Sequence, residues 1–130
     1  MKILSIETSC DETAISLVEA TGDLNSMDFK ILGNALFSQI EIHKQYGGVY
    51  PMMAKREHAK NLPPLPKKGL EEARIVKADK IIYDEKIWKE VEEILKKEDG
   101  LYESLRSLIE NVSKPEIDVS SVTSGPGLAP

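Results

Sequence analysis

Cysteine, histidine and aromatic residues are scarce in this chain of 130 residues. The single cysteine, Cys10, excludes an internal disulfide, so we expect a cytoplasmic, reducing environment. No apolar run approaches the roughly 20 residues that cross a bilayer, and the start of the chain reaches Glu7 too soon to hold a signal-peptide core. These absences predict a protein with no membrane partner.

The chain also lacks a large excess of either positive or negative charge. Apolar residues make up 41% of the chain and charged residues 30%, which is typical of a soluble globular protein. The net charge of -5 gives no general attraction for nucleic acid. Any contact with RNA must therefore come from another chain or from local basic residues, for which the candidates are Lys44, Lys55, Arg56 and Lys60.

The first part of the sequence predicts strands. Residues 2–7, 12–20 and 30–39 are rich in β-branched and other apolar residues, and turn chemistry at Thr21–Asp23 separates the second from the third. Short links between them predict an antiparallel meander at the start of a mixed sheet. A fourth, short strand is predicted over residues 117–123, so the fold class is α/β.

Helices are predicted in the middle of the chain. A polar loop over residues 41–50 precedes a helix at 51–61, which begins at a proline. A second helix is predicted at 66–77, although Pro66 and Gly69 weaken it. Residues 78–115 predict a helical hairpin that Asp99-Gly100 divides. Its apolar positions are Ile87, Val91, Ile94 and Leu95, followed by Leu101, Leu105, Leu108, Ile109 and Val112.

Hydroxyl and small residues form the turn Thr8–Thr13, between the first two strands. Such a turn can present backbone N–H groups and hydroxyls to phosphate oxygens, and Asp11 could hold the water shell of a metal ion. The candidates for a phosphate-binding loop are Ser9, Cys10, Asp11 and Glu12. An ordinary polar hairpin turn is the alternative. Cys10 is expected to be packed rather than reactive, and a Glu7–Asp11 acid–base pair is a minor alternative.

Two further motifs follow. The second runs from His43 to His58, and its candidate residues are His43, Tyr46, Gly47, Gly48, Arg56, Glu57 and His58. Its histidines lack a credible third metal ligand, so structural hydrogen bonds are expected for both. The third motif is Val122–Leu128, where a strand leads into the turn Gly125, Pro126 and Gly127, whose amides could approach a ligand.

The three motifs occur as IETSCDET at residues 6–13, HKQYGGVYPMMAKREH at 43–58 and VTSGPGL at 122–128. In this order they resemble the N-terminal part of the TsaD family of tRNA N6-adenosine threonylcarbamoyltransferases, formerly called Gcp and described as O-sialoglycoprotein endopeptidases of peptidase family M22. Residues 1 to about 75 and 116–130 carry the resemblance. It departs from the family at Met52 and Lys55, where Glu and Ser are usual, and residues 78–115 resemble an insertion.

The resemblance implies an actin-like ATPase (ASKHA) fold, of which residues 1–130 would be a partial N-terminal lobe. It implies transfer of a threonylcarbamoyl group from threonylcarbamoyl-AMP to N6 of the adenosine beside the tRNA anticodon. The implied cofactors are ATP and a divalent metal, iron or zinc, and the implied partners are TsaB-like and TsaE-like proteins and tRNA. The N-lobe helices would include the surface that pairs with TsaB.

The family holds its metal with a His-x-x-x-His motif and a distant aspartate, which have no counterpart in this sequence. We therefore expect an incomplete protein, with no metal ligand in this chain, no tightly bound cofactor and no transferase activity of its own. The alternatives are a non-catalytic TsaB-like scaffold, another ASKHA enzyme such as a small-molecule kinase, and a Gcp-type metallopeptidase. The residues offer no nucleophile–base pair for the last.

Overall fold

A mixed four-stranded sheet forms the base of the fold in the computed structural model, which describes residues 1–23 and 25–125. The strand order is β3-β2-β1-β4, with β1, β2 and β3 antiparallel and β4 parallel to β1. The strands are β1 (Lys2–Glu7), β2 (Glu12–Asp23), β3 (Ser26–Ser38) and β4 (Val119–Val122). The predicted α/β class and its opening antiparallel meander are confirmed.

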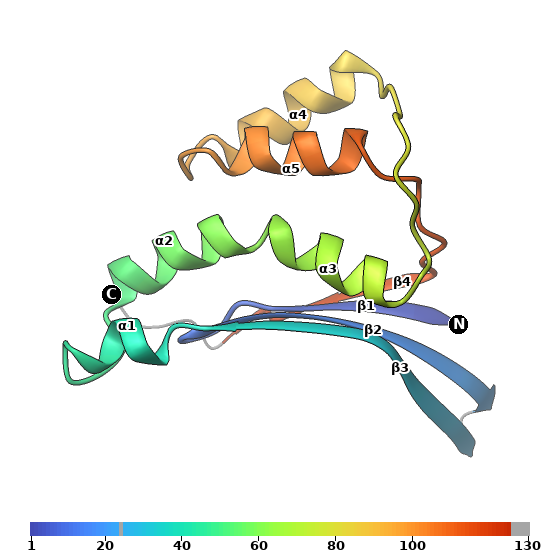
Figure 1. Cartoon of the computed structure of the whole chain (residues 1–130), viewed down its shortest axis with the longest axis horizontal. Helices are drawn as coiled ribbons and strands as arrows, with labels where there is room; N and C mark the ends of the chain where they lie inside the picture. Colours follow the sequence, from blue (N-terminus) through green and yellow to red (C-terminus); the bar gives the residue numbers. More distant parts are fainter. Residues whose placement is uncertain (24, 126–130) are drawn as a thin grey trace.

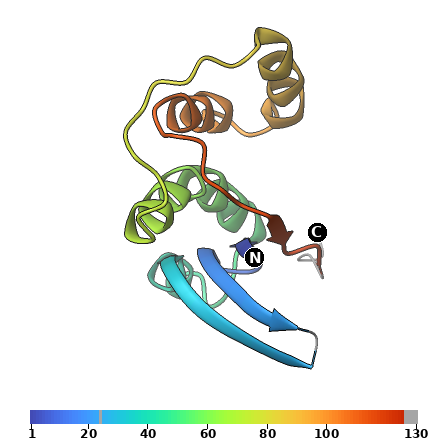
Figure 2. The same ribbon diagram turned by 90° about the vertical axis from the view of Figure 1, so that its right-hand side faces the viewer.

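Helices cover one face of this sheet. α2 and α3 lie across the face, the α4–α5 pair lies above them, and no helix of the described residues covers the opposite face (Figures 1 and 2). The helices are α1 (Ile40–Lys44), α2 (Pro51–Asn61), α3 (Pro64–Glu72), α4 (Glu85–Leu95) and α5 (Leu101–Glu110). In the described part of the chain, every helix is too short or too polar to span a bilayer.

The core lies between the sheet and α3. Ile15 of β2 packs against Ala35 of β3 and Leu65 of α3, and all three side chains are buried. Because side chains alternate along a strand, burial of Ile15 directs Ala14 and Ser16 to the uncovered face. At one point the two backbones nearly touch: a Cβ added to Gly33 of β3 would overlap the carbonyl oxygen of Gly69 in α3.

The β2–β3 hairpin is longer than predicted. Thr21, Gly22 and Asp23 do not form the turn but continue β2, and Asp23 pairs with Ser26. β3 therefore begins at Ser26 rather than at residue 30. The reversal is tight because the carboxylate of Asp23 accepts the backbone N–H groups of Asn25 and Ser26, at 2.9 and 3.1 Å.

One loop prediction and one set of helix bounds were also wrong, whereas α2 has the predicted bounds. The start of the expected polar loop forms helix α1, which buries His43. α3 begins at Pro64 rather than at Pro66, since a proline in the first turn costs no hydrogen bond. It ends at Glu72 because Arg74, with φ of 56°, takes the left-handed conformation that stops a helix.

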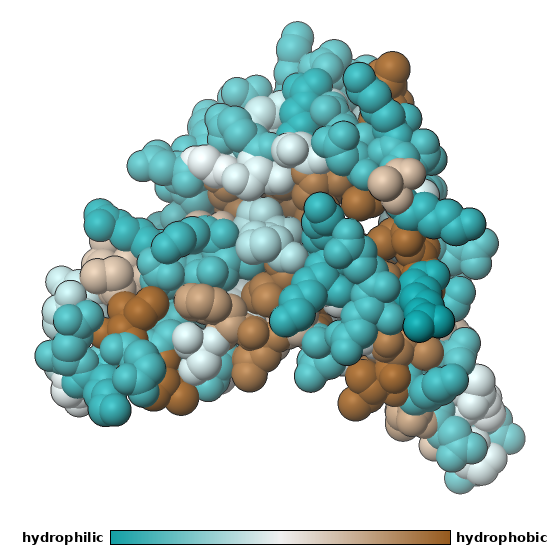
Figure 3. Space-filling model, in the orientation of Figure 1, coloured by the Kyte–Doolittle hydropathy of each residue, from teal (hydrophilic) through white to brown (hydrophobic). Residues whose placement is uncertain are grey.

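The predicted helical hairpin is present as α4 and α5, but its apolar contacts differ from the expectation. Trp88, rather than Ile87, is buried between the helices, and Tyr83, Tyr102 and Arg106 surround its ring. Ile87 and Ile94 are 52% and 72% exposed. In the space-filling view, hydrophobic residues show between this pair and the helices below, while its outer surface is mainly hydrophilic (Figure 3).

Candidate functional site

The parallel pairing of β1 and β4 brings the first and third motifs to the same end of the sheet. The backbone N–H of Thr123 donates to the carbonyl oxygen of Ile6 at 3.1 Å, and the Thr123 hydroxyl donates to the Glu7 carboxylate. The other oxygen of that carboxylate accepts the N–H of Ser9 at 2.7 Å and also its hydroxyl. Ligands of α/β proteins bind beyond the carboxyl ends of parallel strands, which is where this cluster lies.

A shallow groove begins at this cluster, on the sheet face that no described helix covers. Its volume is ≈ 250 Å³. The residues that line it come from β1, β2, β4 and the position after β4: Ser5, Ile6, Glu7, Ala14, Ser16, Ser121, Val122 and Thr123. Hydroxyl groups and one carboxylate therefore provide the polar side chains of the groove.

Glu7 is the anion of this cluster. Hydrogen bonds from Ser9, above all from its hydroxyl, and from Thr123 hold the pKa of Glu7 below its ordinary value because they stabilise the charged form. A carboxyl group with a lowered pKa is a weak candidate for general acid chemistry at neutral pH. The geometry instead indicates that Ser9 provides an N–H and an O–H suited to anionic oxygens, and that Glu7 occupies both.

The second motif reaches the same turn from the helical side of the sheet. Nδ1 of His58, on α2, lies 2.8 Å from the hydroxyl of Thr13, and its Nε2 lies 3.2 Å from the carbonyl oxygen of Cys10. The backbone N–H of Gln39 donates to the carbonyl oxygen of Asp11 at 2.7 Å. The turn Thr8–Thr13 is thus held from both faces of the sheet.

The hydrogen-bond partners assign a tautomer to each histidine. The N–H of Tyr50 donates to Nδ1 of His43 at 3.3 Å, so His43 carries its proton on Nε2 and donates it to Oε1 of Gln39 at 2.9 Å. Nε2 of Gln39 then donates to Nδ1 of His58 at 3.3 Å and to the carbonyl oxygen of Ala54 at 3.4 Å. His58 consequently donates from Nε2 to Cys10. The expected structural hydrogen bonds of both histidines are confirmed.

The remaining candidates of the first turn differ in their roles. Cys10 is exposed, so the expectation that it is packed was wrong. The backbone of Cys10 takes the left-handed conformation that the turn needs, with φ of 52°. In this conformation the side chain of Cys10 is exposed to solvent and its carbonyl oxygen faces His58. Asp11 is half-buried, and Glu12, also half-buried, accepts a hydrogen bond from the Ser38 hydroxyl at 3.4 Å.

Other residues of the second motif lie on the surface. Tyr46 stacks on Tyr50 with 5.7 Å between ring centroids, and Gly47 makes the intervening turn with φ of 72°. Gly48 is exposed, and the half-buried Glu57 accepts a hydrogen bond from Nδ2 of Asn61 at 3.2 Å. Gly125 is exposed. The other residues predicted for the third motif's turn, Pro126 and Gly127, lie outside the described residues.

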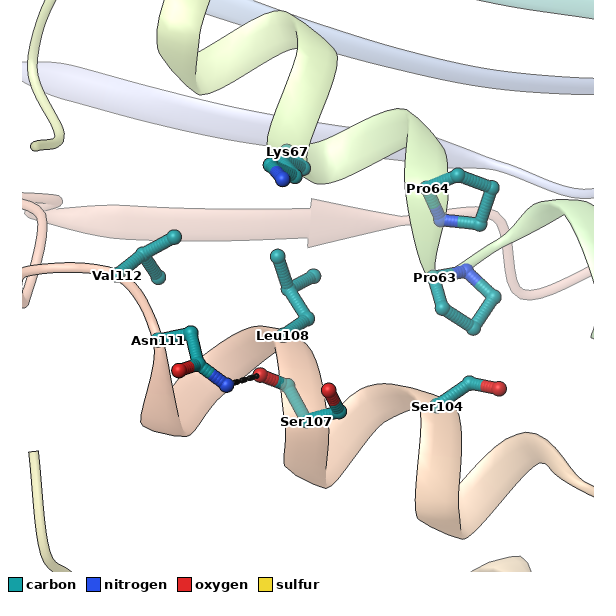
Figure 4. A pocket seen from close by; sticks show the side chains of 8 residues that line it. All are labelled: Pro63, Pro64, Lys67, Ser104, Ser107, Leu108, Asn111 and Val112. Atoms are coloured by element: carbon teal, nitrogen blue, oxygen red, sulfur yellow. Dashed lines mark hydrogen bonds between the residues drawn. The ribbon is translucent and has the colours of Figure 1, made fainter. Parts of the chain in front are cut away.

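Two clefts separate the helical pair from the helices below. Arg56 lines one of ≈ 610 Å³ between α2 and the α4–α5 connection, where Lys55 pairs with Glu98 at 2.7 Å. The second, of ≈ 420 Å³, lies between α3 and α5, with Leu108 and Val112 extending from the α5 side toward α3 (Figure 4). Neither cleft contacts the first turn, so neither belongs to the candidate site.

Sequence reasoning missed Gln39 and the role of Thr123. Gln39 is fully buried although its residue type is usually exposed. Its position four residues before His43 was the available signal, because residues at i and i+4 share a helix face. Thr123 could have been found only from the parallel β1–β4 register, which the sequence alone does not determine.

The fold and the site define an α/β protein in which a hydroxyl-rich turn lies at the carboxyl end of parallel strands. Within residues 1–23 and 25–125, no group of three or more histidine, cysteine or acidic residues is placed to hold a metal ion. Both histidines already use their ring nitrogens in hydrogen bonds. The described residues therefore do not fit a resident metal.

Comparison with known proteins shows which family this chain resembles. Residues 30–83 match the family model described as "TsaD: tRNA N6-adenosine threonylcarbamoyltransferase". A protein of that name from Persephonella marina is 47% identical over 75 residues, 58% of this chain and 20% of the relative. One from Fusobacterium nucleatum is 48% identical over 79 residues, 61% and 21% of the two chains.

These matches confirm the resemblance to the TsaD family. The matched range of the family model contains the whole second motif and excludes the first and third. The chain spans about a fifth of the length of the curated relatives that it matches.

Proposed function

We propose that this chain contributes the first phosphate-facing turn, and the helix that holds it, to a tRNA-modifying transferase of the TsaD type. The observation that carries the proposal is the convergence of three motifs, through the contacts of His58 with Cys10 and of Thr123 with Glu7. Proteins named for threonylcarbamoyl transfer support the reaction class. In this proposal the fold is of the ASKHA type, with residues 78–115 inserted into its N-terminal lobe.

The proposed ligand of the turn is the phosphate of ATP or threonylcarbamoyl-AMP. Ser9 already binds an anionic oxygen with its N–H and hydroxyl, and a phosphate oxygen would take the place of Glu7 there. The hydrogen bonds of His58 and Gln39 to carbonyl oxygens of the turn would keep it in position. They would leave the outward side of the turn free of α2. A metal would add Lewis-acid chemistry, but the described residues contain no group of three or more histidine, cysteine or acidic side chains placed to hold it.

We further propose that the 130-residue chain has no transferase activity alone and acts in the cytoplasm with TsaB-like and TsaE-like proteins and tRNA. Single-turnover transfer can be assayed with the chain, ATP-derived threonylcarbamoyl-AMP, tRNA and the companion proteins. We expect no modified adenosine. Measurable product would overturn this part of the proposal.

A chimeric enzyme tests the positive part. Residues 1–83 of this chain would replace the corresponding segment of the Persephonella marina relative, and transfer to tRNA would be measured. We expect activity to be retained, to fall on the order of tenfold or more with His58→Ala, and to be unchanged by Lys67→Ala on the exposed side of α3. A folded chimera that binds its companion proteins but transfers nothing would favour the scaffold alternative.

A further inference from the structure

The β2–β3 hairpin continues beyond the other strands as a two-stranded arm, formed by residues 20–23 and 26–31. The last β1–β2 pair joins Lys2 to Glu19, so β1 gives the arm no further strand pairs (Figures 1 and 2). Three apolar side chains of β3 alternate along the arm: Met27, Phe29 and Ile31 are 37%, 64% and 66% exposed. A two-stranded ribbon with exposed apolar residues is marginal by itself in water.

The backbone of the arm presents a free edge centred on Phe29. Both backbone groups of Ala20 bond to Met1. The N–H of Ala20 donates to the carbonyl oxygen of Met1 at 2.8 Å, and the carbonyl oxygen of Ala20 accepts from the N-terminal ammonium group of Met1 at 2.9 Å. Ala20 is the β2 partner of Phe29, so the N–H and C=O of Phe29 point away from β2. By strand alternation, those of Met27 and Ile31 do the same, and β3 is the edge strand of the sheet.

The free edge ends where the arm meets the body of the fold. The register of β2 and β3 shifts between Leu17 and Val18, opposite Gly33 and Ile31. Beyond this irregularity, the N–H of Asn34 is occupied by the carboxylate of Glu72 at 3.0 Å. Beyond the arm, at least one donor of the edge is therefore already occupied within the chain.

We propose that two copies of this chain associate by antiparallel pairing of their β3 arms about Phe29. In that register Phe29 faces the partner's Phe29, Met27 faces the partner's Ile31, and Asp28 faces the partner's Lys30. The sequence Met27-Asp28-Phe29-Lys30-Ile31 is thus complementary to itself in charge and in apolar character. A two-fold axis repeats each contact, as a symmetric dimer requires.

The charge pattern of the arm indicates whether its edge favours or prevents association with a second copy. A lysine on an edge strand often prevents association, because it meets a like charge or an apolar surface on a second copy. Here Asp28 lies two residues from Lys30, so antiparallel pairing about Phe29 places opposite charges together twice. Cross-strand pairs of opposite charge stabilise a sheet and like charges destabilise it.

A charge-swap experiment tests the register. Sedimentation of the wild-type 130-residue chain over a range of concentrations should show a monomer–dimer equilibrium. Asp28→Lys and Lys30→Asp, each alone, should weaken the dimer about tenfold or more, since two attractive pairs become repulsive. The double variant Asp28→Lys/Lys30→Asp should restore it, and an equimolar mixture of the two single variants should form heterodimers.

A backbone variant tests the edge itself. Phe29→Pro removes an N–H that points away from β2, so the hairpin should persist while the dimer is lost. Circular dichroism and the fluorescence of Trp88, the only tryptophan, check that each variant is folded. A wild-type chain that stays monomeric would overturn the proposal, as would a dimer that ignores both single charge changes. If the proline variant fails to fold, the charge swap still decides.

Discussion

Nε2 of His58 donates to the carbonyl oxygen of Cys10 across 3.2 Å, and this contact ties helix α2 to the turn between β1 and β2. The other nitrogen of the ring meets Thr13 and Gln39. The imidazole of His58 therefore joins the second motif to the first through the side chain of Thr13 and the backbone of Cys10. These hydrogen bonds couple the turn to α2, which is the structural basis of the proposed site.

Replacing Gln39 by Ala should destabilise the chain. The side chain is fully buried and joins His43, His58 and Ala54, so its loss leaves buried donors and acceptors without partners. The cost should be about 1–3 kcal/mol of unfolding free energy. Urea denaturation followed by circular dichroism measures it.

Gln45→Ala is the matched control for this variant. Gln45 follows α1 and its exposed amide donates to the carbonyl oxygen of Ile42 at 3.0 Å. Its loss should change the unfolding free energy by less than about 0.5 kcal/mol. Equal effects of the two substitutions would contradict the central role of Gln39.

The sequence predicted the strands near the core and helix α2 because apolar alternation and a first-turn proline are local signals. It did not predict that Thr21–Asp23 extend β2, because these residue types usually form turns. Here they pair with β3, and the chain reverses after Asp23, whose carboxylate accepts the N–H of Asn25. In the site, the three motifs were evident, whereas their contacts depended on the parallel register of β1 and β4. Gln39 was missed because a buried glutamine is recognised only through its partners.

Gly33→Ala should destabilise the sheet–helix packing, whereas Gly69→Ala should not. A methyl group on Gly33 would overlap a backbone carbonyl that cannot rotate away, with a cost of about 1–3 kcal/mol. Among the described residues, a methyl group on Gly69 would meet Cγ2 of Ile15 at 3.5 Å, an ordinary contact, and alanine favours a helix interior by up to about 1 kcal/mol. Thermal unfolding of both variants checks the opposite signs.

Cys10→Gly should stabilise the chain slightly. A left-handed residue other than glycine is strained, and relief of that strain exceeds the entropy cost of glycine by at most about 1 kcal/mol. The hydrogen bond from His58 should persist, because its acceptor is the backbone carbonyl. Cys10→Val should have the opposite effect, since a branched side chain fits this conformation poorly. Chemical denaturation of the two variants tests the ordering, and a more stable valine variant would contradict it.

The lowered pKa of Glu7 predicts a stability that depends on pH. Because its folded pKa lies below the unfolded one, Glu7 stabilises the fold above its unfolded pKa of about 4.3, and this contribution disappears as the pH falls through the folded pKa. Glu7→Gln should therefore lower the unfolding free energy more at pH 7 than at pH 3. Ser9→Ala removes the hydroxyl that lowers the pKa most, so it should reduce the wild-type difference between these pH values while the backbone N–H of Ser9 preserves part of it. Urea denaturation of the three proteins at both pH values measures the effect, and a Glu7→Gln cost that is equal at the two would show that the carboxylate charge does not stabilise the turn.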